Sequence, residues 1–250
     1  MTLELGGTYT LTVGNEESEG AGAGTYQINV LEVPPAEVFG IEFGERVTRN
    51  NPDEGAGFIE SPGAQDMYTF DVEPGGDVYF QMVEAILTSG PVNWSVSDES
   101  GEILFETCLQ CGDPGVIALD RGGTYTVTVG GGAGYGTGAY SIVLWSVPGY
   151  QTSEIEIGDT VSGTIESPGA HNLYTFTATA GQTVSFHVLE APNSIQWRLE
   201  DEKENEFFDT CLQCDDPEPV TFEEDGTYTI IIGSDTSPDT GDYEFQLTSP

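Results

Sequence analysis

The chain of 250 residues carries 43 acidic and 5 basic side chains, a formal net charge of −38 at pH 7. This charge excludes a nucleic-acid binder, because there are too few cations to neutralise phosphates, and it excludes docking on anionic lipid. Hydrophobic residues make up 37% of the chain, which is enough to form a core. No apolar run approaches the roughly 18 residues that span a bilayer, so we expect no membrane insertion.

The composition also indicates a compartment. Residues 1–6 have neither a basic start nor an apolar stretch, so the sequence predicts no signal peptide. An acid-rich surface with a single lysine, Lys203, suits a protein that must stay soluble outside a cell. We therefore expect an extracellular or cell-surface location, with this chain as a mature form or an internal segment.

An internal repeat organises the chain. Gly-Gly-Thr-Tyr-Thr-Leu-Thr-Val-Gly at 6–14 returns as Gly-Gly-Thr-Tyr-Thr-Val-Thr-Val-Gly at 122–130 and as Asp-Gly-Thr-Tyr-Thr-Ile-Ile-Ile-Gly at 225–233. Glu-Ser-Pro-Gly-Ala at 60–64 returns at 166–170. The sequence therefore predicts two full units, 36–148 and 149–250. Residues 1–35 match only the last third of a unit.

Within each unit, apolar and polar residues alternate in short runs separated by Gly, Pro, Asn and Asp, a pattern typical of half-buried strands. Strands are expected in the first unit at 41–47, 66–72, 78–83, 92–97, 103–105, 116–119, 124–129 and 139–146. The predicted fold class is all-β, with tandem jelly-roll-like antiparallel β-sandwiches. It comprises two full units plus a partial N-terminal unit, to which 3–13 and 24–33 contribute the closing strands.

The motifs also resemble a known family. Ile-Glu-Ile-Gly-Asp-Thr-Val at 155–161 is followed by Tyr-Thr-Phe at 174–176, Trp-Arg-Leu-Glu-Asp at 197–201 and Gly-Thr-Tyr-Thr at 226–229. This order resembles the bacterial pre-peptidase C-terminal domain, over essentially the whole chain. The resemblance implies a secreted, jelly-roll-type module without catalytic activity, appended to secreted peptidases or strung in tandem in surface proteins. The chain departs from that pattern in its Cys-x-x-Cys loops, in an insertion at 48–55 and in having no peptidase domain.

Four cysteines form two Cys-x-x-Cys pairs, Cys108/Cys111 and Cys211/Cys214. The pairs fit a disulfide inside each loop, a zinc site made by all four thiolates, or free thiols and bonds between units. Each pair is followed by a turn sequence, where a redox motif would begin a helix. We expect the two local disulfides.

No residue pattern predicts catalysis. The two histidines, His171 and His187, align with glutamines in the preceding repeat, so neither is expected to be a general base, and the chain is not expected to be an enzyme. We expect no cofactor. Besides zinc at the cysteines, calcium is a candidate metal, at an acidic cluster that lacks EF-hand spacing: Asp215, Asp216 and Glu218.

Other surface positions are candidates for contacts. Asn93 begins an Asn-x-Ser sequon and is expected to face outward, which makes it a candidate glycosylation site. Trp145 is also expected to face outward, its repeat counterpart Leu31 is apolar, and Tyr150 lies nearby in sequence. These three residues would form either a contact between units or a docking or sugar-stacking patch.

Two functions are compatible with this pattern. The first is a structural repeat protein of an extracellular filament, stalk or surface array, whose partners are copies of itself or further repeats of the same chain. The short proline-containing linkers favour a semi-rigid rod. The alternative is a protein- or polysaccharide-binding accessory module of a secreted hydrolase, with a glycan as a candidate partner.

Overall fold

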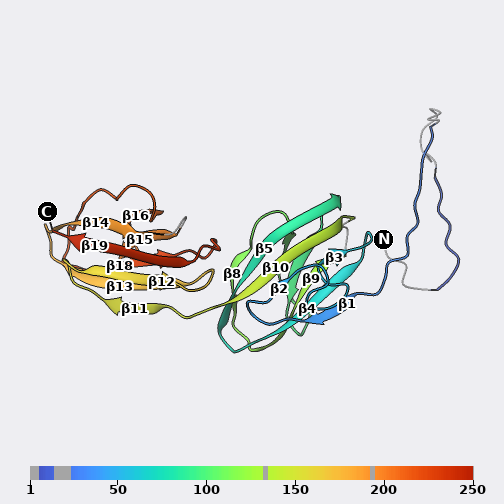
Figure 1. Ribbon diagram of the computed structural model, residues 1–250, viewed down its shortest axis with the longest axis horizontal. Coiled ribbons are helices and arrows are strands. Elements are labelled where there is room, and N and C mark those ends of the chain that lie inside the picture. Colours follow the sequence, from blue (N-terminus) through green and yellow to red (C-terminus); the bar gives the residue numbers. More distant parts are fainter. Residues whose placement is uncertain (1–5, 14–23, 132–134, 192–194, 250) are drawn as a thin grey trace.

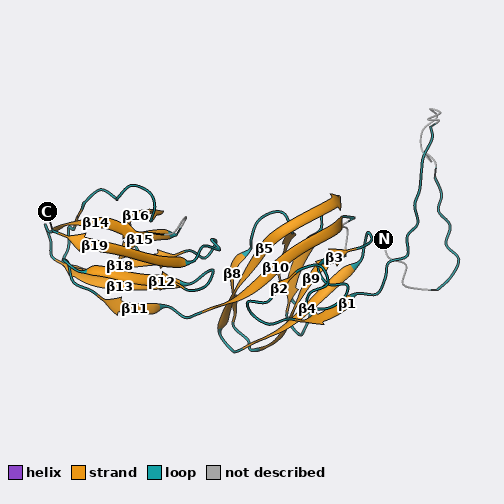
Figure 2. Ribbon diagram, in the orientation of Figure 1, coloured by secondary structure: helices purple, strands orange, loops and turns teal. Residues whose placement is uncertain are grey.

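A computed structural model describes residues 6–13, 24–131, 135–191 and 195–249. These residues form two β-sandwiches, one after the other along the chain (Figure 1). Strands and loops make up the described residues, among which no helix could cross a membrane (Figure 2). The predicted all-β sandwich class is confirmed.

The first sandwich consists of two facing sheets. One sheet contains, in spatial order, β1(Glu37–Gly40), β4(Gln65–Val72), β9(Gly123–Gly130), β6(Asn93–Ser97) and β7(Ile103–Cys108). The other contains β2(Arg46–Val47), β10(Thr137–Val147), β5(Gly76–Ser89) and β8(Gly115–Leu119), with β3(Phe58–Ile59) paired to β10. The inward-facing residues form a single core around Trp94, which is fully buried.

The second sandwich repeats this strand order. Its first sheet contains β11(Gln151–Glu154), β13(His171–Ala178), β18(Gly226–Gly233), β15(Gln196–Asp201) and β16(Glu206–Cys211). Its second sheet contains β12(Thr160–Ile165), β19(Gly241–Thr248), β14(Thr183–Glu190) and β17(Val220–Thr221). A separate core surrounds Trp197, the repeat counterpart of Trp94. Because each sandwich has its own core, their relative placement depends on the contact between them.

One predicted strand is wrong. The segment 41–47 does not run straight, because a turn at Glu42–Glu45 divides it. Gly44 has a φ of +79°, and the Glu45 N–H donates to the Glu42 carbonyl at 3.1 Å. Only Arg46 and Val47 pair, with β10. The preceding residues form β1, which lies parallel to β4, whereas the prediction had only antiparallel pairing.

The N-terminal arm, residues 6–13 and 24–33, is extended but joins no sheet (Figure 2). The sequence predicted strands at 3–13 and 24–33, of which residues 3–5 lie outside the described part. Two isolated strands bury too little apolar surface to be stable in water. The strands predicted here are therefore not formed by the described residues.

Candidate functional site at the contact between the sandwiches

The two sandwiches are joined by direct hydrogen bonds as well as by the linker. The loop between β18 and β19 lies along strand β8, where the Val116 N–H donates to the Asp235 carbonyl at 2.9 Å. The Tyr79 hydroxyl, from β5, donates to the Thr236 carbonyl at 3.2 Å. Strand β8 is an edge strand of its sheet, so the loop covers backbone groups that would otherwise be open to other chains.

Tyr79 is the most deeply buried side chain of this contact. It is 0% exposed, yet it belongs to neither core. Its hydroxyl also donates to the Asp113 carboxylate at 3.0 Å. Burial, followed by the charge of Asp113, raises the pKa of Tyr79, so the side chain remains a neutral donor. An aromatic ring buried between two sandwiches stabilises their contact through the apolar area it removes from water.

Two glycines allow the backbones to approach closely. A Cβ added at Gly169 would lie 2.5 Å from Val116 Cγ2 and 3.1 Å from Val147 Cγ2. A Cβ at Gly115 would lie 2.6 Å from the Asp235 carbonyl oxygen. Both glycines have positive φ, +79° and +83°, which side-chain-bearing residues rarely adopt. Both sides of the contact therefore favour glycine over any residue with a side chain.

A buried histidine lies beside the contact. His171 is 4% exposed, and neither ring nitrogen has a hydrogen-bond partner among the described residues. Its Nδ1 lies 3.6 Å from the Asp235 carboxylate, and the Tyr150 ring meets its ring edge-on at 5.6 Å. Burial lowers the pKa of His171, and the negative charge of Asp235 only partly opposes this effect. The neutral imidazole is thus the form that this environment favours.

Both predicted local disulfides are present. Cys108 is bonded to Cys111 and Cys211 to Cys214, each within a turn at the end of an edge strand, with Cα atoms 5.2 Å apart. The same turns hold a buried leucine in each unit, Leu109 or Leu212.

The other predicted contact residues lie apart from one another. Trp145 is half-buried on its own sandwich, where its indole N–H donates to the Gln81 side chain at 2.8 Å. Leu31 is exposed on the N-terminal arm, and Tyr150 is exposed beside His171. Asn93 is half-buried, with its amide 3.4 Å from Glu106, while Trp94 points inward as the alternation predicted. These residues do not form one patch.

The acidic cluster proposed for calcium has a different arrangement. The Asp216 carboxylate accepts a hydrogen bond from the Val188 N–H at 3.0 Å and contacts His187 Nδ1 at 3.0 Å. Within the described ranges, no group of three or more Asp, Glu, His or Cys side chains is arranged to hold a metal ion.

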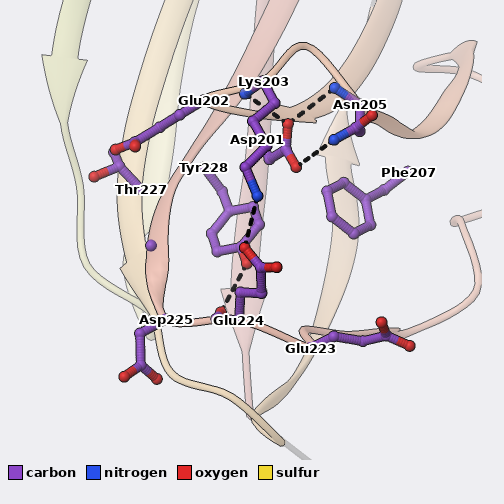
Figure 3. A pocket seen from close by; sticks show the side chains of 11 residues that line it. Asp201, Glu202, Lys203, Asn205, Phe207, Glu223, Glu224, Asp225, Thr227 and Tyr228 are labelled. Atoms are coloured by element: carbon purple, nitrogen blue, oxygen red, sulfur yellow. Dashed lines mark hydrogen bonds and ion pairs between the residues drawn. The ribbon is translucent and has the colours of Figure 1, made fainter.

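A surface cavity lies at the far end of the second sandwich (Figure 3). Tyr228 and Phe207 form an aromatic wall, with their rings edge-on and 5.6 Å apart. Lys203 lines the same cavity, and its ammonium donates to the Glu224 carboxylate at 2.8 Å. The first sandwich has an ion pair at the equivalent position, between Arg121 and Asp98 at 3.8 Å, with the positive and negative charges exchanged between the two turns. In each sandwich, this position is therefore occupied by a cation of the chain itself.

Sequence reasoning missed the roles of Tyr79, in the contact, and of His171, beside it. Tyr79 was counted only as part of a strand, and its outward direction within the alternation of β5 was a signal that could have been used. His171 was considered only as a general base and was set aside because it aligns with Gln65. His171 is buried beside Tyr150 and Asp235, which lie far from it in sequence, so its burial could not be read from the neighbouring residues.

Comparisons with known proteins find similarity in structure only. No family model matches the sequence, and no curated protein matches it. The pre-peptidase C-terminal domain of collagenase from Bacillus anthracis is similar at 17% identity, over 40% of this chain and 98% of that one, with a TM-score of 0.34. A periplasmic inhibitor of g-type lysozyme, PliG from Aeromonas hydrophila, is similar at 11% identity, over 40% and 99%, with a TM-score of 0.33. The CUB1-EGF-CUB2 domains of human MASP-1/3 are similar at 12% identity, over 82% and 99%, with a TM-score of 0.28.

Proposed function

We propose that this chain is a non-catalytic structural repeat protein of an extracellular filament, stalk or surface array. The observation that supports the proposal best is the contact between the sandwiches. A fully buried tyrosine, the backbone hydrogen bond from Val116 to Asp235 and two matched glycines hold consecutive units in a fixed arrangement. A binding module on a flexible tether has no need of such a contact.

Two further features support the location and the role. Disulfides persist in oxidising environments outside the cytosol, and both Cys-x-x-Cys loops contain one. The high negative charge keeps such a protein soluble outside the cell. In this proposal, the partners are further repeats of the same type.

Electron microscopy of material isolated from the source organism tests this proposal. We expect filaments or stalks with an axial repeat of one sandwich plus its linker. Monodisperse particles that bind insoluble polymers would contradict the structural role.

The accessory-module function remains the second candidate, favoured by the rings of Tyr150 and Phe207, which are 67% and 38% exposed. Aromatic rings on a surface can stack on sugar rings. Co-sedimentation with insoluble polysaccharide or collagen fibres tests it, and Tyr150→Ala should abolish binding if that ring is the contact. Unchanged sedimentation of the Tyr150→Ala variant would exclude this ring as the binding surface.

A further inference from the structure

The N-terminal arm has the sequence of the last two strands of a unit, which correspond to β9 and β10, but it lies outside any core. Its apolar side chains are between 44% and 86% exposed: Leu11, Val13, Tyr26, Ile28 and Val30. Their repeat counterparts in the first sandwich are at most 2% exposed: Val127, Val129, Tyr140, Ile142 and Leu144. Alternating apolar residues of this kind indicate two strands, one in each sheet, whose apolar sides face the core between the sheets.

The two complete sandwiches show which strand contacts both of these closing strands. In the first, β4 lies antiparallel to β9, with Phe70 opposite Tyr125 and Tyr68 opposite Val127. The Phe70 and Tyr125 rings stack at 5.9 Å. The Tyr140 hydroxyl, from β10 in the facing sheet, contacts the Tyr68 hydroxyl at 2.7 Å. It also donates to the Asp66 carboxylate.

The second sandwich repeats this arrangement with one substitution. Phe176 lies opposite Tyr228, and their rings are 5.9 Å apart. The Tyr243 hydroxyl contacts the Tyr174 hydroxyl and accepts a hydrogen bond from the Asn172 amide, both at 2.7 Å. The covering strand thus reads Asx-x-Tyr-Thr-Phe in both units. When buried, the hydroxyl of a tyrosine at the position of Tyr26 needs hydrogen-bond partners. The Asx and Tyr side chains of such a strand supply them.

The first sandwich also shows where the covering unit would sit. Val147, the last residue of β10, packs on Gly169, and its repeat counterpart Val33 packs in the same way on Gly63, with Cγ2 3.0 Å from an added Cβ. Gly169 is also contacted by Tyr79 and Val116 of the preceding unit and is buried, whereas Gly63 is only half-buried. The turn at Gly63, which is only partly covered, and the exposed arm therefore border the same space beside the first sandwich.

We propose that this space is filled by the first strands of another repeat of this type, which lie ahead of the arm in the same polypeptide. The order within each full unit supports this source, because β4 and β13 precede the two closing strands of their units in sequence. The repeat presents an Asx-x-Tyr-Thr-Phe strand to the arm, with its Phe opposite Tyr9 and its Tyr opposite Leu11. Its counterparts of Tyr79 and Val116 cover Gly63. The inference rests on the proposed tandem array and specifies how the units join.

Hydrogen exchange in an extended chain tests the proposal. A copy of residues 36–121 is joined ahead of Gly6, which recreates the order of a full unit, and exchange is followed by mass spectrometry. We expect amide exchange in peptides that contain Leu11 and Ile28 to slow by at least about 100-fold relative to the 250-residue chain. A matched control carries Tyr68→Ser and Phe70→Ser in the added copy only, and we expect the protection to be lost.

Three outcomes would overturn the proposal. The first is an unprotected arm in the extended chain while both original sandwiches keep their protection. The second is equal protection in the control, which would reject the recognition strand. The third is protection of the arm in the 250-residue chain at high concentration, which would make a second copy the occupant. None of these outcomes depends on whether the native material forms filaments, so the proposed function is tested separately.

Discussion

Asp66 in the first sandwich and Asn172 in the second take the same position beside a pair of tyrosine hydroxyls. Asp66 lies opposite Val129 and accepts from Tyr140, whereas Asn172 lies opposite Ile232 and donates to Tyr243. Asp66 is 1% exposed. Its burial raises its pKa from 3.8 to about 6, although hydrogen bonds from the two tyrosines act in the opposite direction. The repeat thus contains a charged and a neutral version of one network.

Asp66→Asn should stabilise the first sandwich at pH 7. Because the folded pKa of Asp66 lies above its unfolded value, its contribution to stability is fully present below about pH 4 and is lost as the pH rises through about 6. A shift of this size corresponds to about 3 kcal/mol, of which the variant should recover part at pH 7. Urea unfolding between pH 4 and 7 measures this effect.

The reciprocal variant Asn172→Asp is the matched control. It should make the second sandwich less stable at pH 7 than at pH 5, by less than the effect at Asp66, because Asn172 is only half-buried. Equal pH profiles for the Asp66→Asn variant and the parent chain would show that Asp66 is not the group responsible.

His171 should give the second sandwich the opposite pH dependence. Burial lowers its folded pKa below the ordinary value of 6.5, so its contribution to stability is present above pH 6.5 and is lost as the pH falls through the folded pKa. His171→Gln, which installs the residue of the preceding repeat, should remove this dependence. An NMR titration of the imidazole with a midpoint at or above 6.5 would contradict the assignment.

Gly169→Ala should loosen the contact between the sandwiches. The new methyl group would meet Val116 at 2.5 Å, in addition to the cost of a positive φ. Gly181→Ala is the control, because Gly181 has a φ of +84° and nothing within 4 Å of an added Cβ. NMR relaxation should show faster, partly independent tumbling of the sandwiches in the first variant and unchanged tumbling in the second.

Non-reducing peptide mapping should recover Cys108–Cys111 and Cys211–Cys214 as separate disulfides. Closing so short a loop removes little chain entropy, so replacing one pair by serines should cost about 2 kcal/mol or less. Stoichiometric zinc in the purified protein would contradict this pairing.

Salt should stabilise the whole chain. The net charge of −38 makes the surface repel itself, and dissolved ions screen that repulsion over roughly 10 Å at 0.1 M. The melting temperature should rise between low salt and about 1 M sodium chloride. A steady fall over that range would show that specific ion pairs outweigh the general repulsion.

Repetition made much of the fold predictable. Alternation around residues such as Tyr125 and Trp94 placed most strands and the core, because burial of one sheet face depends on residues close in sequence. The turn at Gly44 and the parallel pairing of β1 could not be predicted, since both depend on where the chain must return to join the second sheet.

The contact between the sandwiches was beyond prediction from one unit. Tyr79, Gly115 and Gly169 lie far apart in sequence, and each has an ordinary explanation as a strand or turn residue. Their shared role follows only from the placement of two complete units. The outward alternation of Tyr79 was the one local signal of a second buried surface.

The rate at which the Val116 amide hydrogen exchanges with solvent tests the central claim, that the sandwiches are held in a fixed arrangement. Val116 lies on the edge strand β8, and its N–H donates across the contact to the Asp235 carbonyl. We predict that this amide exchanges at least about 100-fold more slowly in the parent chain than in the Gly169→Ala variant. Fast exchange at Val116 in the parent chain, with the rest of β5 and β8 protected, would contradict the account.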